Sequence, residues 1–553
     1  MEMGSIPISS KKKFYNMNLF KDNKILVTCA LPYSNGPIHI GHLLEHIQAD
    51  IWVRYKKYNF YDVKFICSDD SHGTSILLKS NNLKINPKKL ISDIYVDHKK
   101  DLKKFNINYN IYYSTHSLEN MFFLNNIYNV LLKKKLIFKK NVYQFYDKYY
   151  SVFLSDRLFV SNCKVCLSKL ENNNYCVLCN NYYRNYDIIN PISLLSNKKP
   201  ILKKTEHLFF KLNEYKEFLK EKILNIIFQK EVLNKIYKVF DNDLELWDIS
   251  RDKLYFGFKI PNEKNKYFCV WFDAIIGYIS TFYKLCKVNN LNFFEYWNEF
   301  SNCKLYQFIG KDIVYFHSIF WLSILKSINF RIPNKLIVHG HITINNNKMS
   351  KSLNNYITAK DYINKNIDTD FLRYFYASKL SNNINDIDFN TKEFIYKINN
   401  VLINKILNIP NRVVNFLYFY FNGFLSSSDI EDINLYNIFL SKHTYINLYY
   451  NNFEYNLVIK IVEELSDLLN KYISDREPWN KINNKKKLHD ICTMVINLFK
   501  ILFIYLRPIL PNISKKVEFF LGIKLDIKFI YIYLFNIKIN KYFITKKILD
   551  IKF

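Results

Sequence analysis

The sequence predicts an α/β protein in which a parallel-sheet domain is split by an insertion and followed by an all-α helical bundle. Apolar runs of strand length alternate with helical periodicity in two separate stretches, which is the pattern of a parallel sheet. A segment with four clustered cysteines separates these stretches, and beyond about residue 399 the apolar spacing is helical. At ~150 residues per domain, a chain of 553 residues has roughly three or four domains.

The composition indicates a globular protein, with 49% hydrophobic and 23% charged residues. The formal net charge of +30 favours a polyanionic partner such as nucleic acid. This signal is weakened because Lys, Asn, Ile, Tyr and Phe are abundant throughout the chain, beside only 10 Gly and 12 Pro. No apolar run is long enough to span a membrane, and Met1–Lys24 lacks the apolar core of a secretory signal.

Six of the ten cysteines are scattered among apolar neighbours, which favours a reducing compartment over a disulfide framework. We therefore expect a cytoplasmic protein. These six residues are Cys29, Cys67, Cys269, Cys286, Cys303 and Cys492.

The first half of the sheet domain begins with a strand, a tight loop and a helix. Ile25–Leu31 is a short apolar run that ends at Pro32 and a turn-rich segment, after which apolar residues recur at helical spacing from Ile40 to Ile51. A second strand, Val63–Cys67, runs into the polar segment Ser68–Gly73. Ligands bind at the carboxyl ends of strands in open parallel sheets, so both loops are candidate site segments.

Between about Asn141 and Leu246 this alternation is interrupted, and it then resumes with three further expected strands, Tyr267–Phe272, Leu305–Ile309 and Lys335–His339. We expect the following boundaries: a disordered extension at 1–23, the first half of the sheet domain at 24–138, the insertion at 139–248, the second half at 249–340, a connective segment at 341–399 and the helical domain at 400–553.

Three long helices are expected in the helical domain, at Asn400–Tyr420, Tyr455–Ile473 and Lys487–Tyr505, because apolar residues recur there at helical spacing. The stretch after Leu521 is rich in Lys, Ile and aromatic residues. We expect it to add further strand or helix to the bundle.

The tetrapeptide His39–His42 lies where the first loop enters its helix. Backbone N–H groups and the positive helix end face an anion there, and the two imidazoles share a face because they are three residues apart. Gly41 between them allows close approach to the backbone. The pattern therefore indicates a phosphate site, although a metal-binding or purely exposed His pair also fits these four residues.

A polar stretch about three hundred residues later contains Lys348-Met349-Ser350-Lys351-Ser352. Two lysines on a mobile loop can close over a polyphosphate and neutralise charge on leaving pyrophosphate. A basic loop on its own is usually solvated surface. Its pairing with His39–His42, one motif on each half of the split domain, favours the phosphate function.

Two Cys-x2-Cys motifs lie inside the insertion, and this spacing is typical of metal binding. They supply four thiolates for a tetrahedral Zn²⁺. A site closed by four cysteines has no open coordination position, so we expect a structural ion that stabilises a segment with little core. The ligands are Cys163, Cys166, Cys176 and Cys179.

The two phosphate motifs resemble the HIGH and KMSKS elements of class I aminoacyl-tRNA synthetases. Longer segments are similar to the methionyl-tRNA synthetase family, over about residues 24–521. These segments are Thr28–Tyr33, Trp247–Arg251, Val270–Ala274 and Gly310–His317.

The resemblance implies a Rossmann-type catalytic domain that joins L-methionine to tRNA(Met) with ATP and Mg²⁺, through a methionyl adenylate and with release of AMP and pyrophosphate. It implies that His39, His42, Lys348 and Lys351 are catalytic and, with Gly41, bind ATP. Positioning and electrostatics supply the catalysis, and no protein nucleophile is needed. The chain lacks the C-terminal module that some relatives use to dimerise, so a monomer is expected.

The same resemblance assigns eight residues to the methionine pocket, with Asp70 taking the ammonium group. Aromatic walls suit a polarisable thioether, although each aromatic residue taken singly also fits plain core packing. One departure from the family is Ile275, where Pro is usual, and we expect a more flexible wall there. The eight residues are Leu31, Tyr33, Asp70, Trp271, Ala274, Tyr278, Phe316 and His317.

In the helical region, Asn404, Asn408 and Arg412 fall at four-residue spacing on one helix face. Such groups read splayed bases together with a stacking aromatic, for which Pro478-Trp479 is the candidate. A solvated helix face is the alternative, but the positions match the family's anticodon-reading helix and its tryptophan.

Two other functions stay open at this point. One is a zinc-containing RNA-binding protein derived from a synthetase but without catalysis, which the presence of both phosphate motifs disfavours. The other is a different class I ligase. The isoleucyl, valyl and leucyl enzymes need a large editing domain, for which the insertion is too small, and a cysteinyl enzyme would use its metal to contact the substrate.

Overall fold

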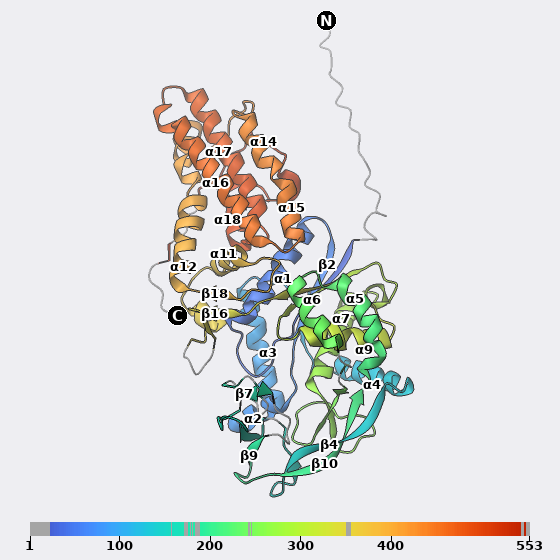
Figure 1. Ribbon diagram of the computed structural model, residues 1–553. Helices are drawn as coiled ribbons and strands as arrows, with labels where there is room; N and C mark the ends of the chain where they lie inside the picture. The colour runs from blue at the N-terminus through green and yellow to red at the C-terminus, as the bar shows by residue number, and fades with distance from the viewer. Residues whose placement is uncertain are drawn as a thin grey trace.

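The computed structural model describes residues 23–155, 157–170, 175–176, 178–179, 181–182, 188–241, 244, 246–349, 355–542 and 547–548. The expected N-terminal extension therefore lies outside the described residues, apart from Asn23. Figure 1 shows an α/β body with the insertion at one end and the helical bundle at the other.

A five-stranded sheet forms the centre of the α/β body, and all its neighbouring strands are parallel. Its order is β15-β14-β1-β2-β3, so the chain builds outward from β1 on one side and then returns on the other. The order reverses between β1 and β14, which is where ligands bind in open parallel sheets. The strands are β1 (Lys24–Cys29), β2 (Asp62–Asp69), β3 (Ile111–Ser114), β14 (Lys304–Gly310) and β15 (Lys335–His339).

Side chains on both faces of this sheet are buried. Successive side chains of a strand point to opposite faces, so neighbouring residues of one strand pack into different cores. In β1, Val27 packs into the core shared with the helical bundle, and Leu26 packs into the core shared with α7. The helices of the α/β body are α1 (Ile40–Tyr58), α2 (Thr74–Asn82), α3 (Pro87–Lys104), α4 (Leu118–Lys133), α7 (Val270–Asn289), α8 (Phe294–Trp297) and α9 (Trp321–Ser327), with a π-helical turn η4 (Phe316–Phe320) before α9.

Four of the five expected strands lie in this sheet, and the prediction of a strand at Tyr267–Phe272 was wrong. Only β13 (Lys266–Phe268) is extended, and it pairs with β12 (Ser250–Asp252) in a separate ribbon. α7 begins at Val270 and every residue of Ile275–Phe282 is buried, so this long apolar run is a helix enclosed on all sides. β3 was not predicted from the sequence, because this strand has only four residues and is polar at one end.

The insertion contains an antiparallel sheet of order β11-β10-β4-β5, beside a small cysteine-bearing subdomain with its own core. The long ribbon of β4 and β10 reaches away from the α/β body (Figure 1). The elements are β4 (Ile137–Asp147), β5 (Val152–Phe153), β6 (Phe159–Asn162), β7 (Tyr175–Cys176), β8 (Asn181–Tyr182), β9 (Ile189–Ser193), β10 (Ile201–Phe210), α5 (Lys216–Ile226), α6 (Lys230–Tyr237) and β11 (Trp247–Asp248).

The connective segment and the bundle complete the fold, and two of the three expected long helices are confirmed, as α16 and α17. The elements are β16 (Ile342–Ile344), β17 (Asn347–Lys348), α10 (Ala359–Asn364), α11 (Thr369–Lys379), β18 (Ile387–Phe389), α12 (Thr391–Tyr396), η5 (Lys397–Leu407), η6 (Pro410–Arg412), α13 (Val414–Phe421), α14 (Ile433–Ser441), α15 (His443–Asn451), α16 (Tyr455–Arg476), α17 (Lys485–Leu506), α18 (Pro511–Leu521) and η8 (Ile527–Phe529).

The third expected helix, Asn400–Tyr420, is broken into three pieces. A π-helical stretch ends at Leu407, a 3₁₀ turn covers Pro410–Arg412, and α13 follows. Pro410 explains the break, since proline has no N–H and its ring clashes with the preceding turn. α17 is the only helix of the described chain that is long and apolar enough to cross a bilayer, but 89% of its apolar window is buried in the bundle core.

A fully buried arginine on α11 joins the bundle to helix α1. Arg373 donates to the Asp50 carboxylate at 2.7 Å and to the carbonyl oxygens of Phe105, Pro508 and Ile509. The two charged groups are 0% and 1% exposed. Because a buried guanidinium needs its donors satisfied, this one residue fixes α1 against the turn between α17 and α18.

Candidate functional site

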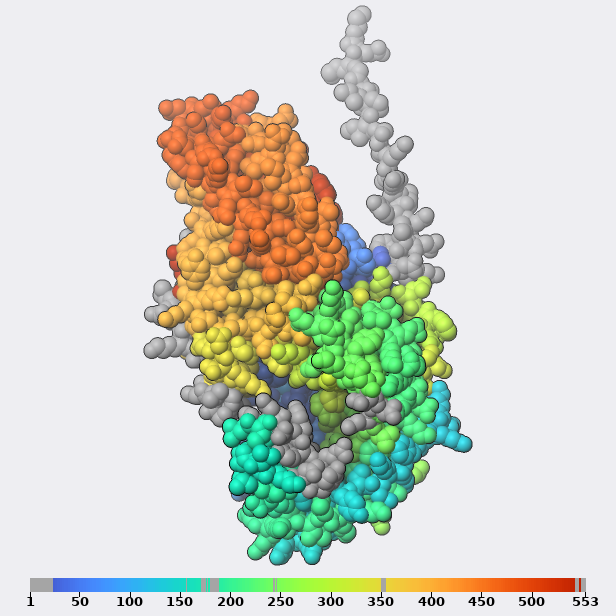
Figure 2. Space-filling model, viewed as in Figure 1, coloured from blue at the N-terminus to red at the C-terminus, as the bar shows by residue number. Residues whose placement is uncertain are grey.

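Two cavities meet at the carboxyl ends of β1 and β14, where the strand order reverses. The first cavity has a volume of about 540 Å³ and the second about 570 Å³. Their common wall is formed by Ala30, Leu31, Tyr33 and Ile313. Figure 2 shows the recess between the insertion and the rest of the chain, with the blue N-terminal segment visible in its depth. A ligand group at the common wall is therefore reached from both cavities.

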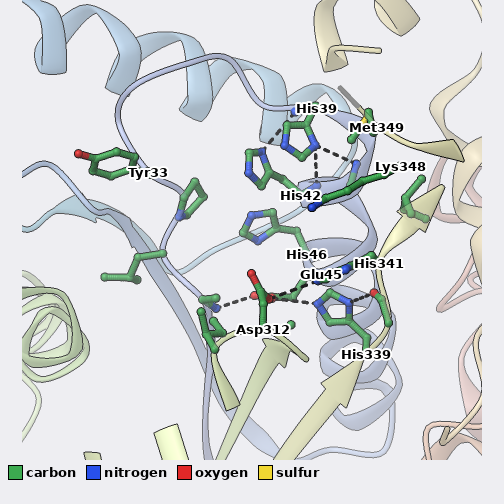
Figure 3. A pocket seen from close by; sticks show the side chains of 18 of the residues that line it. Tyr33, His39, His42, Glu45, His46, Asp312, His339, His341, Lys348 and Met349 are labelled. Carbon is green, nitrogen blue, oxygen red and sulfur yellow. Dashed lines mark hydrogen bonds and ion pairs between the residues drawn. The ribbon is translucent and has the colours of Figure 1, made fainter. Parts of the chain in front are cut away.

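Two stacked imidazoles lie at the start of α1 in the first cavity (Figure 3). The ring centroids of His39 and His42 are 3.5 Å apart. His39 is the N-cap of α1, and its Nδ1 accepts hydrogen bonds from the N–H groups of Gly41 at 3.1 Å and His42 at 3.3 Å. His42 Nδ1 accepts in return from the His39 N–H at 3.4 Å.

This capping arrangement decides which ring atom can donate. A neutral imidazole carries one proton, so a ring that accepts through Nδ1 donates through Nε2. Burial, and next the neighbouring His39 ring, hold the pKa of His42 well below its usual range. His42 is therefore a neutral donor at pH 7 and not a cation.

One part of the phosphate hypothesis needs correction. We expected backbone N–H groups of the first turn of α1 to face the anion, but those of Gly41 and His42 are used by the His39 ring, and that of Ile40 donates to Ile357. The Nε2 atoms of the two imidazoles are therefore the candidate donors at this helix end. A Cβ at Gly41 would lie 3.0 Å from the His39 ring and 3.2 Å from the Met349 methyl group, so glycine allows this close packing.

The second phosphate motif reaches the same cavity. Lys348 ends the short strand β17 and lines the first cavity with Met349, and Figure 3 shows both beside the two histidines. The chain that follows returns to α1, where Ala359 donates its N–H to Ile38 O at 2.8 Å. Lys351 lies outside the described residues.

Several ionisable residues of the first cavity were not predicted from the sequence, among them Glu45, His46, Asp312 and His341. Glu45 accepts from the Ala30 N–H at 2.5 Å and from His339 Nε2 at 3.0 Å. His339 Nδ1 also donates, to Gly340 O at 2.7 Å. Burial alone would lower the pKa of His339, but its bond to Glu45 outweighs this and raises the pKa. The sequence pattern predicts a helix around Glu45, but it gives no indication that Glu45 is buried and paired with His339.

All eight residues expected to form the second pocket line the second cavity. Trp271 stacks on Phe316 with ring centroids 3.9 Å apart, and its indole is 40% exposed. Tyr278 donates its hydroxyl to His317 Nε2 at 2.8 Å, while His317 Nδ1 donates to Ile313 O at 3.0 Å.

The His317 tautomer is fixed by these two bonds, and burial lowers its pKa to about 4. The ring is therefore neutral at pH 7. Ile275, where the family usually has Pro, is 4% exposed within α7 and also lines the cavity.

Asp70 is the carboxylate of the second cavity. Its Oδ1 is buried and has no hydrogen-bond partner among the described residues. Burial, and next the negative charge of Asp273, raise the pKa of Asp70 well above its usual range. A cationic ligand group would offset both the burial of the Asp70 carboxylate and its repulsion by Asp273, so the position suits an ammonium ion.

The four cysteines of the insertion form one cluster, with all their sulfur atoms within 4.8 Å of one another. Cys163 and Cys179 Sγ are 3.9 Å apart, and Cys166 and Cys176 Sγ are 3.4 Å apart. The N–H groups of Cys166 and Cys179 each point at the sulfur three residues earlier, at 3.4 Å. Four sulfurs arranged in this way, with N–H groups to stabilise thiolate charge, fit a zinc ion.

The candidate base-reading residues are brought together only in part. Arg412 lies 5.9 Å from the ring centroid of Trp479, which is 43% exposed, while Pro478 is buried. Arg412 also donates to Asn470 at 3.2 Å and to Ser474 at 3.1 Å.

The expected single helix face is not observed here. Asn404 is exposed in η5, Asn408 caps that helix, and Arg412 belongs to the next turn. The break at Pro410 separates Arg412 from the two asparagines.

Comparison with known proteins agrees with this architecture. A family model described as tRNA synthetases class I (M) matches residues 25–414. The chain is 52% identical over 521 residues to a methionine–tRNA ligase of Buchnera aphidicola subsp. Baizongia pistaciae, covering 94% of this chain and 95% of that protein. It is 50% identical over 507 residues to the methionine–tRNA ligase of Wigglesworthia glossinidia brevipalpis, covering 91% and 92%.

A solved structure shares the fold. Mycobacterium tuberculosis methionyl-tRNA synthetase bound by methionyl-adenylate matches with a TM-score of 0.77 at 18% identity, covering 94% of this chain and 98% of that one.

Proposed function

This chain belongs to the class I aminoacyl-tRNA synthetases, in the methionine–tRNA ligase family, and we propose that its two joined cavities serve the activation of methionine by ATP. In the proposed reaction L-methionine becomes methionyl adenylate with release of pyrophosphate. The methionyl group then passes to tRNA(Met), and AMP is released.

The observation that carries this proposal is the common wall of the two cavities. The first cavity offers donors suited to phosphate, and the second offers one buried carboxylate among aromatic residues. The methionine carboxylate at the common wall can attack the α-phosphorus of ATP in line, because both substrates are held in place before they react.

For the first cavity we propose that His39 and His42 donate through Nε2–H to the ATP phosphates. Lys348, together with Lys351, neutralises charge on the leaving pyrophosphate, and Gly41 makes room for the stacked rings. Mg²⁺ is proposed to accompany ATP, as expected for a polyphosphate substrate. Donors held in a water-poor site stabilise developing charge without reorganising.

For the second cavity we propose that Asp70 binds the methionine ammonium group. Leu31, Tyr33, Trp271, Ala274, Tyr278, Phe316 and His317 would surround the side chain. A neutral His317 held by Tyr278 suits a thioether better than a protonated His317 would, because the thioether sulfur is a weak acceptor with no charge.

The cysteine cluster is proposed to hold one structural Zn²⁺. Few apolar residues pack around it, so the metal would supply the folding energy that this small core lacks. Four sulfurs leave no position for substrate, which argues against metal chemistry in the ligase reaction.

We propose that tRNA(Met) is read in the helical domain by Asn404, Asn408, Arg412, Pro478 and Trp479. The half-exposed indole beside the Arg412 guanidinium is suited to stacking an unpaired base. The domain boundaries given above, a monomeric state and a cytoplasmic location are proposed as well. The cytoplasm is supported by the six scattered thiols, which are all buried.

Detection of the adenylate tests the proposal directly. The zinc-loaded protein is incubated with methionine and Mg²⁺–ATP and separated from free nucleotide, and the bound species is identified by mass spectrometry. We expect methionyl adenylate, and much less of it with Asp70→Asn. Folded, zinc-loaded protein that yields no adenylate would instead support the RNA-binding function without catalysis.

A further inference from the structure

Three side chains of metal-binding type lie together at the floor of the first cavity, apart from the four-cysteine cluster. Cys29 ends β1, and Glu45 and His46 are consecutive residues of α1. The Cys29 sulfur, one carboxylate oxygen of Glu45 and one ring nitrogen of His46 all lie within 4.8 Å of one another. These residues are 0%, 7% and 2% exposed. The proposed function assigns a role to none of them.

The three side chains are reached from the first cavity. Glu45 and His46 line that cavity, whereas Cys29 is not part of its lining. Figure 3 shows the His46 ring between the stacked imidazoles of His39 and His42 and the Glu45 side chain. An ion that enters the cavity therefore has direct access to a carboxylate and an imidazole, with a sulfur close behind them.

Glu45 keeps acceptor positions for a metal although it is already hydrogen-bonded. Its Oε1 accepts from the Ala30 N–H at 2.5 Å, and its Oε2 accepts from His339 Nε2 at 3.0 Å. A carboxylate offers about four acceptor positions, so these two donors leave about half of them. Hydrogen bonds of this kind to a ligating carboxylate are typical of metal sites, where they hold the ligand in place.

His46 and Cys29 differ in what they must lose to bind a metal. Burial, and next the charge of His98, lower the pKa of His46 to about 3, so the ring is neutral at pH 7. The Tyr109 hydroxyl lies 2.5 Å from His46 Nδ1 and orients the ring. Burial, and next the charge of Glu45, raise the pKa of the Cys29 thiol well above its usual range. The thiol is therefore protonated, and its proton passes to solvent as a metal–sulfur bond forms.

The donor set favours one kind of ion. A thiolate is a soft ligand that suits Zn²⁺ and not Mg²⁺, and imidazole suits Zn²⁺ as well. Thiolate and carboxylate together offset the charge of a divalent ion. Zn²⁺ bonds of roughly 2.0–2.3 Å place tetrahedral ligands about 3.4–3.6 Å apart, so these side chains close around an ion with shifts of up to about 1.4 Å.

We infer that Cys29, Glu45 and His46 bind one Zn²⁺ ion and that this ion inhibits the activation of methionine. Three protein ligands leave a fourth coordination position, which faces the first cavity because Glu45 and His46 line it. The ion and the group in its fourth position occupy space that ATP is proposed to fill. Binding of the ion is independent of the proposed function, whereas the inhibition rests on it.

Metal content tests the site without reference to activity. Full-length protein loaded with Zn²⁺ at the four-cysteine cluster alone is dialysed against Zn²⁺ buffered by a chelator, and the zinc bound per chain is measured. We expect the unchanged protein to take up a second ion. Cys29→Ala should bind that ion more than about a hundredfold more weakly, because loss of an outer hydrogen-bond partner alone costs about 10–100-fold. Cys67→Ala removes a buried thiol from the neighbouring strand β2 and should bind as the unchanged protein does.

Cd²⁺ in place of Zn²⁺ shows whether the sulfur is a ligand. The ultraviolet absorption of Cd²⁺–thiolate bonds should increase when the unchanged protein takes up the second ion. It should not increase in Cys29→Ser, which keeps the size of the side chain. An equal increase in both proteins, or equal zinc uptake by the unchanged protein and Cys29→Ala, would overturn the site.

Methionine-dependent exchange of pyrophosphate into ATP tests the inhibition, with ATP well below its KM. At a free Zn²⁺ concentration ten times the dissociation constant of the second ion, about nine-tenths of the chains carry it. Exchange should therefore fall about tenfold in the unchanged protein and in Cys67→Ala. Cys29→Ala should lose little at the same free Zn²⁺, and this variant also controls for Zn²⁺ bound by ATP.

The outcomes separate this inference from the proposed function. Equal inhibition of all three proteins, or uptake of the second ion without inhibition, would overturn the inhibitory role. Absence of exchange in the unchanged protein before Zn²⁺ is added would refute the proposed function. In that case zinc uptake by the unchanged protein and Cys29→Ala would still decide whether the metal site exists.

Discussion

Replacement of His39 separates two functions that the structure combines in one ring. Nδ1 caps α1 by accepting from the N–H groups of Gly41 and His42, and Nε2–H is the proposed phosphate donor. Asparagine is among the best N-cap residues, whereas alanine is among the poorest. His39→Asn should therefore keep the cap and lose the donor, and His39→Ala should lose both.

The expected magnitudes follow from these two contacts. Loss of an N-cap costs about 0.5–2 kcal/mol, so His39→Ala should lower the free energy of unfolding by about 1 kcal/mol. His39→Asn should change it by only a few tenths of a kcal/mol, because its side-chain oxygen can accept from the same N–H groups. Loss of one preorganised donor lowers kcat about 10²- to 10³-fold. We expect that loss in methionine-dependent exchange for both variants.

Urea denaturation gives the stabilities, and pyrophosphate exchange at saturating ATP gives kcat. An Asn variant that keeps near-normal exchange would show that the ring does not act on the phosphates. If the Asn variant is as unstable as the Ala variant, the capping argument is wrong.

Four more predictions follow from other contacts. Asp50→Asn should lower the free energy of unfolding by about 3–5 kcal/mol, the cost of breaking a buried ion pair, because Arg373 stays buried; a denaturation curve like that of the unchanged protein would contradict it. Burial, and next Asp273, raise the pKa of Asp70, and the protonated acid cannot pair with an ammonium ion. KM for methionine should therefore rise as pH falls through that raised pKa, and a flat profile would refute the pairing. Chelation of zinc should expose the insertion to proteolysis and reduce exchange, whereas full exchange after verified metal loss would exclude a structural role. Trp479→Ala should raise KM for tRNA much more than it alters exchange, and equal losses would mean that the indole supports the fold.

The sheet and its ligand edge were predictable because strands buried on both faces are continuous apolar runs. Ile25–Leu31 and Lys335–His339 are of this kind; the first overlaps the central strand β1 and the second is β15 at one edge of the sheet. The failure at Tyr267–Phe272 has the opposite cause. Two neighbouring elements are both apolar there, and a short strand cannot be told from the first turn of a buried helix by periodicity alone.

The site was predictable where chemistry requires a short motif, and not where it depends on the folded arrangement. His39–His42 and the four cysteines are visible as local patterns. Glu45 and His339 are 294 positions apart in sequence, and only the sheet topology brings them within 3.0 Å. The break before Arg412 was visible as Pro410, but four-residue spacing suggested a continuous helix.

Pyrophosphate exchange measured separately with each of the twenty amino acids is the decisive test of methionine activation by this chain. We expect exchange with methionine and far weaker exchange with isoleucine, valine, leucine and cysteine. Strong exchange with another amino acid in preference to methionine, or none with any, would contradict it.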